Sequence, residues 1–255
     1  MTVVFMHHDV IDASKVRRSG FYGAGAEVYK VTLDRFREQI AGLAAAFPGK
    51  APKLDAGAPF ALTFDDGGAS ATEVVAEVLA ERGWYAHFFV VTGLLGMPGF
   101  VSVSGLRALV ASGHTIGTHT VTHPHRLQAL PYARIVREWQ DSRERLSDLL
   151  GQPVDCGSVP GGCCSRAVRR AAAQAGLSLL FTSEPTIRRY ESDGVGVCGR
   201  FAVWGRDPAE GAVRLAERAY ARRMRALRWQ ALGVAKNALG PAYPAVREGL
   251  LRLRA

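Results

Sequence analysis

Two aspartates stand where they could both reach one pocket. Asp65 and Asp66 follow the apolar run 60–64 and precede the pair Gly67-Gly68. At the exit of a strand into a loop, adjacent carboxylates can converge, and hydrolytic sites of α/β barrels gather at such strand ends. An Asp-Gly pair at a strand end can equally be a plain turn. The motif alone therefore leaves a site and a turn open.

Two histidines have a spacing typical of metal ligands. His119 and His123 are four residues apart, and His125 follows shortly after. Two imidazoles at this spacing can bind one metal if the segment is helical or tightly turned; core or surface histidines are the alternative. One carboxylate and two imidazoles form a facial ligand set with open positions, as a catalytic divalent metal needs. Together the two motifs are far more specific than either alone.

The elements that must position these residues alternate between strands and helices, which favours a parallel sheet or barrel. Strands are predicted at residues 3–6, 60–64, 85–91, 115–117, 154–159, 179–182 and 199–203. Helices are predicted at residues 33–46, with Thr32 as N-cap, and at 71–82, 104–111, 132–150 and 165–175. Gly83, Gly113, Gly151 and Gly176 follow four of these helices, where a left-handed C-cap is expected.

The length and composition fit one domain with a helical extension. The chain has 255 residues, 48% of them hydrophobic, enough for one substantial core. Strand signals stop near Asp207, and two helical segments follow, separated by Gly240-Pro241. We therefore predict a barrel over residues 1–206 and a basic helical tail over 207–255.

The positive charge belongs to that tail. The chain's formal charge is +9, and residues 212–255 hold ten arginines and lysines against two glutamates, so they carry +8 of it. The tail also interleaves apolar residues with its arginines. It can be a solvated helix packed on the barrel or a basic amphipathic helix lying on anionic lipid. Nucleic acid is disfavoured, because no recognised binding motif or stacking platform accompanies the charge.

The remaining bulk features favour a cytoplasmic protein, with peripheral membrane attachment as an option. The first residues form a short apolar run that meets His7-His8-Asp9 at once, unlike a secretory signal. No stretch approaches the roughly 18 apolar residues of a membrane-spanning helix. The four cysteines show no CxxC spacing and are expected to be free thiols.

The two motifs resemble those of the polysaccharide deacetylase (NodB-homology) family of carbohydrate esterases. Residues 63–67, Thr-Phe-Asp-Asp-Gly, are similar to its TFDDG motif, and residues 119–123 to its H[ST]xxH motif. The resemblance, which runs to about residue 205, implies an α/β fold, a distorted (β/α)7 TIM-like barrel. It further implies that Asp65 is the general base and that Asp66, His119 and His123 bind one divalent metal. Zinc is the first expectation, with cobalt and nickel as alternatives.

Two other family motifs are altered here. The third, RxPxG, corresponds to residues 158–162, so Ser158 replaces its arginine; the Asp-Trp element of the fourth is missing near residues 182–184. Losing both partners of an Arg–Asp pair avoids a buried unpaired charge. By resemblance the Gly161 N–H contacts the oxyanion, and we assign Pro160 and Gly162 to substrate binding.

The catalytic acid must come from an unusual place. All seven histidines lie in the first 125 residues, so the family's late histidine is absent. The opening Phe5-Met-His-His-Asp-Val10 resembles the LMYHxV start of poly-N-acetylglucosamine deacetylases, which implies His8 as the acid. Arg200 is assigned to substrate, with support of the base or a surface charge as alternatives. His125 is a further substrate contact or a loop surface residue.

The function that follows is metal-dependent N-deacetylation of an amino sugar in a glycan, glycolipid or glycan precursor. An amide carbonyl resists attack, so it must be polarised and met by an activated nucleophile, and a metal with a general base does both. The first rival is a hydrolase of small formyl, ureido or acetyl amides. The second is a catalytically silent glycan-binding module. Packing roles are expected for His87, His114 and Cys163-Cys164.

Overall fold

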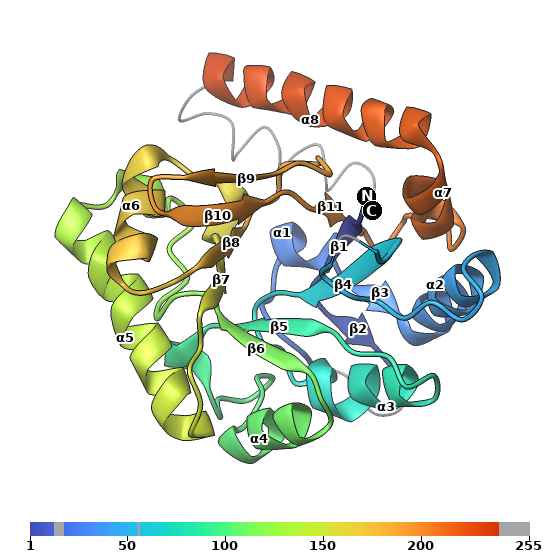
Figure 1. The fold of residues 1–255 in the computed structure, drawn as a ribbon, viewed down its shortest axis with the longest axis horizontal. Coiled ribbons are helices and arrows are strands. Elements are labelled where there is room, and N and C mark those ends of the chain that lie inside the picture. Colours follow the sequence, from blue (N-terminus) through green and yellow to red (C-terminus); the bar gives the residue numbers. More distant parts are fainter. Residues whose placement is uncertain (13–17, 56, 240–255) are drawn as a thin grey trace.

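The protein is a curled, mostly parallel sheet surrounded by helices (Figure 1). The computed structural model describes residues 1–12, 18–55 and 57–239. The main sheet has nine strands in the order β11-β1-β4-β5-β6-β7-β8-β10-β9. Its strands are β1 (Val3–His7), β4 (Phe60–Phe64), β5 (His87–Val90), β6 (Thr115–Thr118), β7 (Cys156–Ser158), β8 (Leu179–Phe181), β9 (Arg189–Ser192), β10 (Val195–Cys198) and β11 (Phe201–Ala202). This arrangement confirms the predicted α/β distorted barrel.

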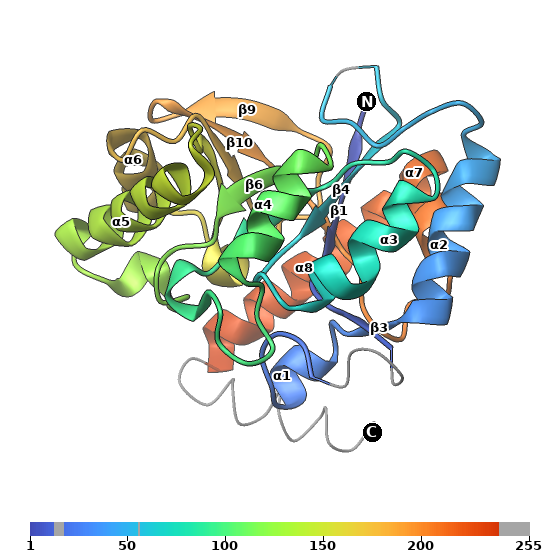
Figure 2. The ribbon, with the colours of Figure 1, turned by 90° about the horizontal axis from the view of Figure 1, so that it is seen from below.

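Helices cover the outside of the sheet, and several match the sequence prediction closely (Figures 1 and 2). The helices are the short α1 (Ala24–Glu27) and the main helices α2 (Leu33–Ala46), α3 (Ala76–Ala80), α4 (Val103–Ala111), α5 (Tyr132–Leu150), α6 (Arg166–Gln174), α7 (Gly211–Glu217) and α8 (Ala219–Leu239). Thr32 caps α2 by accepting a hydrogen bond from the Arg35 N–H at 3.4 Å. The four glycines predicted as C-caps all have positive φ.

Both faces of the barrel strands are buried, which explains their continuous apolar character. All five residues of β1 and of β4 are buried. Alternate side chains of β1 and β4, Phe5 and Leu62 among them, pack under the helices. The opposite side chains, Val4 of β1 and Ala61 of β4, form a second cluster inside the barrel with side chains of β5, β7, β8 and β10, namely Phe89, Cys156, Phe181 and Cys198. The packing fixes the register, so the strands of this parallel set end at one edge of the barrel.

Several short elements were not predicted. β2 (Val10–Ile11) and β3 (Val31–Thr32) form a separate two-stranded sheet. β9 and β10 form a hairpin whose turn places Asp193 and Gly194 at φ 56° and 84°. The predicted strand 199–203 is shorter, because the chain bends at 199–200 between β10 and β11. The predicted helix 71–82 begins with a π-helical turn, Ala71–Val75.

The helical extension starts inside the body of the protein. Ala212 and Leu215 of α7 are buried in the main hydrophobic core, whereas α8 is largely exposed. The helical conformation is interrupted at Arg218, which is extended and separates α7 from α8; the sequence did not predict this interruption. The helical segment predicted beyond Gly240-Pro241 lies outside the described residues. Among the helices described, none has the length and apolar character needed to cross a membrane.

Candidate metal centre

The predicted metal ligands lie together where neighbouring strands end. Asp65 and Asp66 follow β4 directly, and His119 follows β6. The Asp65 N–H donates to the His7 carbonyl at 2.9 Å, and the His119 N–H donates to the Val90 carbonyl at 2.9 Å. The sheet itself therefore places these side chains at one end of the barrel.

Asp66 lies between the two imidazoles. Its Oδ1 is 3.5 Å from Nε2 of His119 and 3.5 Å from Nε2 of His123, and the three residues form a cluster able to hold a metal. Ligand atoms about 2.0–2.1 Å from a tetrahedral zinc lie about 3.4 Å from one another. Asp66 Oδ1 is also buried without a hydrogen-bond partner. A buried carboxylate oxygen so placed fits a cation that would satisfy it.

A hydrogen bond orients one imidazole toward Asp66, and burial keeps the other neutral. His119 Nδ1 donates to the Ser158 carbonyl at 2.7 Å, so in the neutral ring the lone pair is on Nε2, which faces Asp66. Burial opposes a charge on His119, but the carboxylates of Asp65 and Asp66 outweigh it and raise its pKa. For His123, burial and the neighbouring His119 lower the pKa to about 4. His123 is therefore neutral at pH 7, as ligation requires.

The backbone around these ligands is strained. Asp66, Thr120 and His123 have φ values of 74°, 69° and 54°, a region that side chains other than glycine rarely adopt. Among the described residues only Asp193 shares this property outside the site. Such strain persists only when surrounding contacts hold it, and it concentrates at functional sites.

Glu138 of α5 supplies contacts that hold the His119–His123 loop. Its Oε2 accepts hydrogen bonds from the Val121 and Thr122 N–H groups at 3.0 and 2.9 Å, and its Oε1 accepts one from Thr122 Oγ1 at 2.8 Å. Glu138 is only 4% exposed. In the sequence Glu138 stands beside Trp139, among residues of α5 that prove to be buried, but nothing there indicates which segment it contacts.

Replacing Glu138 by Ala should weaken divalent metal binding by about 10- to 100-fold, because losing the outer contacts that hold a metal's ligands in place typically costs that much. Competition with a chromogenic chelator measures the affinity. Glu144→Ala is the matched control on the same helix, since Glu144 is exposed and accepts a hydrogen bond from Gln140 of the same helix. If both variants bound the metal with equal affinity, Glu138 would have no role in supporting the metal ligands.

Asp65 is held by a buried arginine. Arg200 Nη1 donates to Asp65 Oδ1 at 2.7 Å and Nη2 donates to Oδ2 at 2.8 Å, a bidentate pair. Ser158 Oγ also donates to Asp65 Oδ2 at 3.0 Å. Burial would raise the pKa of Asp65, but the charge and hydrogen bonds of Arg200 hold it well below its usual range. Asp65 is therefore ionised at neutral pH.

The assignment of Arg200 to substrate was wrong. Arg200 is 1% exposed, so it is not a surface charge either. Its remaining donors go to the Thr182 carbonyl, Thr63 Oγ1 and Ser158 Oγ, at 3.0, 3.0 and 2.7 Å. All five guanidinium N–H groups are thus used within the protein. Arg200 provides the support of Asp65 that was considered as an alternative, and Ser158 leaves room for it.

His8 and His7 face opposite ways at the end of β1. His7 is buried against Phe36 and Phe64, where burial lowers its pKa to about 4. His8 is half-buried, stacks on Tyr29 at 4.5 Å, and has a buried Nδ1 without a hydrogen-bond partner. Its charge contributes to the low pKa of both Asp65 and Asp66, so it lies within electrostatic reach of the site.

The other predicted site residues surround this centre. His125 is exposed, and its ring lies 5.6 Å from that of His123. Gly161 has a left-handed φ of 65°, and a Cβ there would lie 2.6 Å from the His125 carbonyl. Gly162 is half-buried against Ser183, while Pro160 is buried. Burial of Pro160 favours a role in shaping this turn over direct contact with substrate.

Three further side chains are buried or half-buried within the protein. His87 lies near Phe89 and Phe181 inside the barrel, and burial lowers its pKa to about 4. His114 Nδ1 accepts a hydrogen bond from the Ala86 N–H at 3.2 Å. Burial raises the pKa of the Cys164 thiol to about 11. These surroundings agree with the structural roles expected for these three residues. Cys163 is exposed instead, so the packing role expected for it was wrong.

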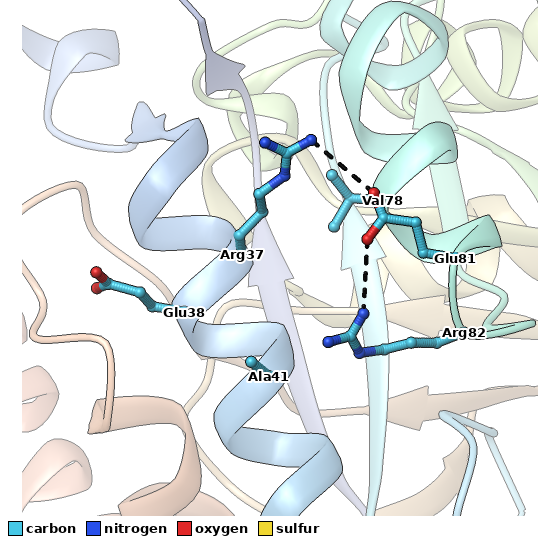
Figure 3. A pocket seen from close by; sticks show the side chains of 6 residues that line it. All are labelled: Arg37, Glu38, Ala41, Val78, Glu81 and Arg82. Atoms are coloured by element: carbon cyan, nitrogen blue, oxygen red, sulfur yellow. Dashed lines mark ion pairs between the residues drawn. The ribbon is translucent and has the colours of Figure 1, made fainter.

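A hollow between α2 and α3 is separate from the metal centre. Arg37 of α2 pairs with Glu81 at 3.9 Å, and Arg82 pairs with the same carboxylate at 3.6 Å (Figure 3). Glu38, Ala41 and Val78 also line the hollow, and none of the proposed metal ligands does. It is a surface feature of the outer helices.

Comparison with known proteins agrees with this geometry. Residues 55–180 match the family model described as polysaccharide deacetylase. The comparisons thus support a relationship between this chain and the polysaccharide deacetylase family. The match includes Asp65, Asp66, His119, His123 and Ser158, but neither His8 nor Arg200.

Individual relatives share only part of the chain. A gellan lyase of a Bacillus species is 32% identical over 103 residues, 40% of this chain and 4% of that protein. Chitin deacetylase 1 of Cryptococcus neoformans is 32% identical over 124 residues, 48% of this chain and 25% of that protein. The chain thus spans a small part of these curated relatives. A Streptococcus pyogenes deacetylase structure, determined with acetate, covers 85% of this chain and 98% of its own, with TM-score 0.68 and 20% identity, and shares the fold.

Proposed function

We propose that this chain hydrolyses the N-acetyl amide of an amino sugar in a glycan, glycolipid or glycan precursor, using one divalent metal. The similarity to polysaccharide deacetylases supports a deacetylase-type activity. The observation that carries the proposal further is the partnerless Asp66 Oδ1, 3.5 Å from two imidazole nitrogens, next to the ionised carboxylate of Asp65. The proposed metal ligands and the proposed general base are therefore neighbours in one site.

Asp66, His119 and His123 would hold the cation, with zinc first and cobalt or nickel as alternatives. Bound there, it would polarise the amide carbonyl and make a water molecule more acidic. The polar environment that the protein contributes is already assembled, because His119 and the loop of His123 are fixed by Ser158 and Glu138.

Asp65 is the general base of this proposal. The Arg200 fork holds both of its oxygens, so the carboxylate has one orientation and remains ionised. It would accept the proton of the attacking water. The Gly161 N–H, in the turn beside His125, is the candidate donor to the developing oxyanion.

His8 would donate a proton to the leaving amine. His8→Phe keeps the stacking partner for Tyr29 but removes the proton, so turnover should fall by about 10²- to 10⁴-fold. His125→Phe is the matched control at an exposed histidine next to the site, and we expect a smaller effect. Steady-state acetate release measures both, and a His8→Phe enzyme within threefold of wild type would exclude His8 as the acid.

The test of the function is an acetate-release screen on metal-loaded protein. Its arms are N-acetylated monosaccharides, oligosaccharides, lipid-linked acceptors, and small formyl, ureido or acetyl amides, with Asp65→Asn as background. Acetate release from an amino-sugar arm above that background is the expected result. Hydrolysis confined to the small amides would favour that rival, and no turnover in any arm would favour a silent binding module.

A further inference from the structure

Helix α8 carries apolar side chains that the protein leaves in contact with solvent. Of the twelve large hydrophobic residues exposed in the described parts of the chain, six lie on this one helix. They are Tyr220, Met224, Leu227, Trp229, Leu232 and Val234, which are 73, 47, 49, 44, 46 and 69% exposed. Scattered exposed hydrophobics are ordinary, but such a cluster marks an interaction surface.

Four of these residues form a stripe along one face of the helix. Tyr220, Met224, Leu227 and Val234 follow one another at intervals of four, three and seven residues, which places them on the same side. We call these four the α8 stripe. Because α8 leaves them exposed, this face is not used to hold the helix on the body.

Another set of α8 residues attaches the helix to the barrel. Arg225 Nη2 pairs with Asp207 Oδ2 at 3.0 Å, and its guanidinium lies 4.4 Å from the Trp204 ring centre. Arg222 Nη1 donates to the Leu215 carbonyl of α7 at 2.7 Å. These half-buried arginines lie on the side of α8 away from the stripe, so the stripe faces outward.

All charged residues of α8 have the same sign. Residues 219–239 contain four arginines and one lysine and no aspartate or glutamate. Arg223 is exposed and next to Met224 of the stripe. An apolar face bordered by cationic side chains is complementary to a bilayer surface with anionic headgroups, where the apolar side chains enter the interface.

The position of α8 relates this surface to the metal centre. In Figure 1 the helix runs past β9 and β11, and in Figure 2 it descends to the level of α1, at the end of the barrel toward which the arrow of β1 points. Trp204, which Arg225 contacts, follows β11 closely, and β11 pairs with β1, the strand that leads to His8. A membrane on the α8 stripe would therefore lie near the catalytic end.

We propose that the α8 stripe docks this protein on an anionic lipid bilayer. A second copy of the chain is a poorer occupant, because it would bring its own exposed Arg223, which is next to Met224 of the stripe, against the Arg223 of this copy. A nucleic acid would leave the aliphatic side chains Met224, Leu227 and Val234 without a matching surface. The proposal goes beyond the proposed function and does not depend on it, because binding is measured without turnover.

The test is co-sedimentation of the full chain with vesicles of phosphatidylcholine alone or with one quarter phosphatidylglycerol. We expect binding only to the anionic vesicles, weakening as salt is raised. Leu227→Glu and Arg223→Glu should each lower the vesicle affinity by about tenfold or more. Their matched controls, Tyr190→Glu and Arg170→Glu, make equivalent changes at exposed positions on β9 and α6 and should bind as wild type does.

Several outcomes would overturn the proposal. These are absence of binding, equal binding to neutral vesicles, or binding that both α8 variants retain. A dimer dissociated by Leu227→Glu in the absence of lipid, or tighter binding to a single-stranded oligonucleotide than to vesicles, would assign the stripe to another occupant. Circular dichroism of each variant checks the fold. Unchanged acetate release from a soluble acceptor in the α8 variants keeps this result separate from the fate of the catalytic proposal.

Discussion

Asp65→Asn should lower the turnover number for acetate release by about 10²- to 10⁴-fold, the usual contribution of a general base. The amide has nearly the size of the carboxylate but cannot accept the proton. The neighbouring ligand set is unchanged, so the variant should still bind one divalent cation. Acetate release and metal content measured on the same preparation check both statements.

The matched control is Asp66→Asn at the adjacent position. This variant should lose metal affinity and activity together, because Asp66 Oδ1 is the atom facing both imidazoles. The pair of variants thus separates a base from a ligand. If Asp65→Asn released its metal, or kept wild-type turnover, the roles given to the two aspartates would be wrong.

Arg200→Met should destabilise the folded protein strongly. It leaves the Asp65 carboxylate buried without its bidentate partner, and breaking a buried pair in this way costs about 3–5 kcal/mol. For a chain of this size, that loss lowers the melting temperature by about 10 °C. Turnover should fall as well, because the base loses its fixed orientation. Chemical denaturation and acetate release give the two quantities.

Two further variants separate the effect of the Arg200 hydrogen bonds from that of its charge and from that of losing any arginine. Arg200→Lys keeps the charge but loses the fork, so it should recover only part of the stability. Arg189→Met removes an arginine that donates to the Leu54 carbonyl at the surface and should cost far less. An Arg200→Met protein as stable and as active as wild type would show that the pair with Asp65 has no role.

The barrel and the metal ligands could be predicted because their signals are local. Residues 33–46 and 132–150 show a helical period and were predicted with their observed ends, and β4 matches its apolar run. Asp66, His119 and His123 stand in short motifs at strand ends, and parallel strands bring those ends together. Spacing in the sequence was therefore enough to place them.

The support around the site could not be predicted in the same way. Arg200 reaches Asp65 across 135 residues of chain, from the bend between β10 and β11, which no local pattern indicates. Glu138 required knowing that its face of α5 packs over the His123 loop. The short strands β2 and β3 have two residues each, too few to show a period.

The central claim is that Asp66, His119 and His123 together hold the one cation on which hydrolysis depends. Its most direct test is acetate release from an N-acetylated oligosaccharide during stepwise addition of zinc to chelator-treated protein. We predict that activity is absent at first, rises in proportion to zinc, and saturates at one equivalent per chain, with no recovery in His119→Ala. Full activity after chelation, or recovery in His119→Ala equal to wild type, would contradict the account.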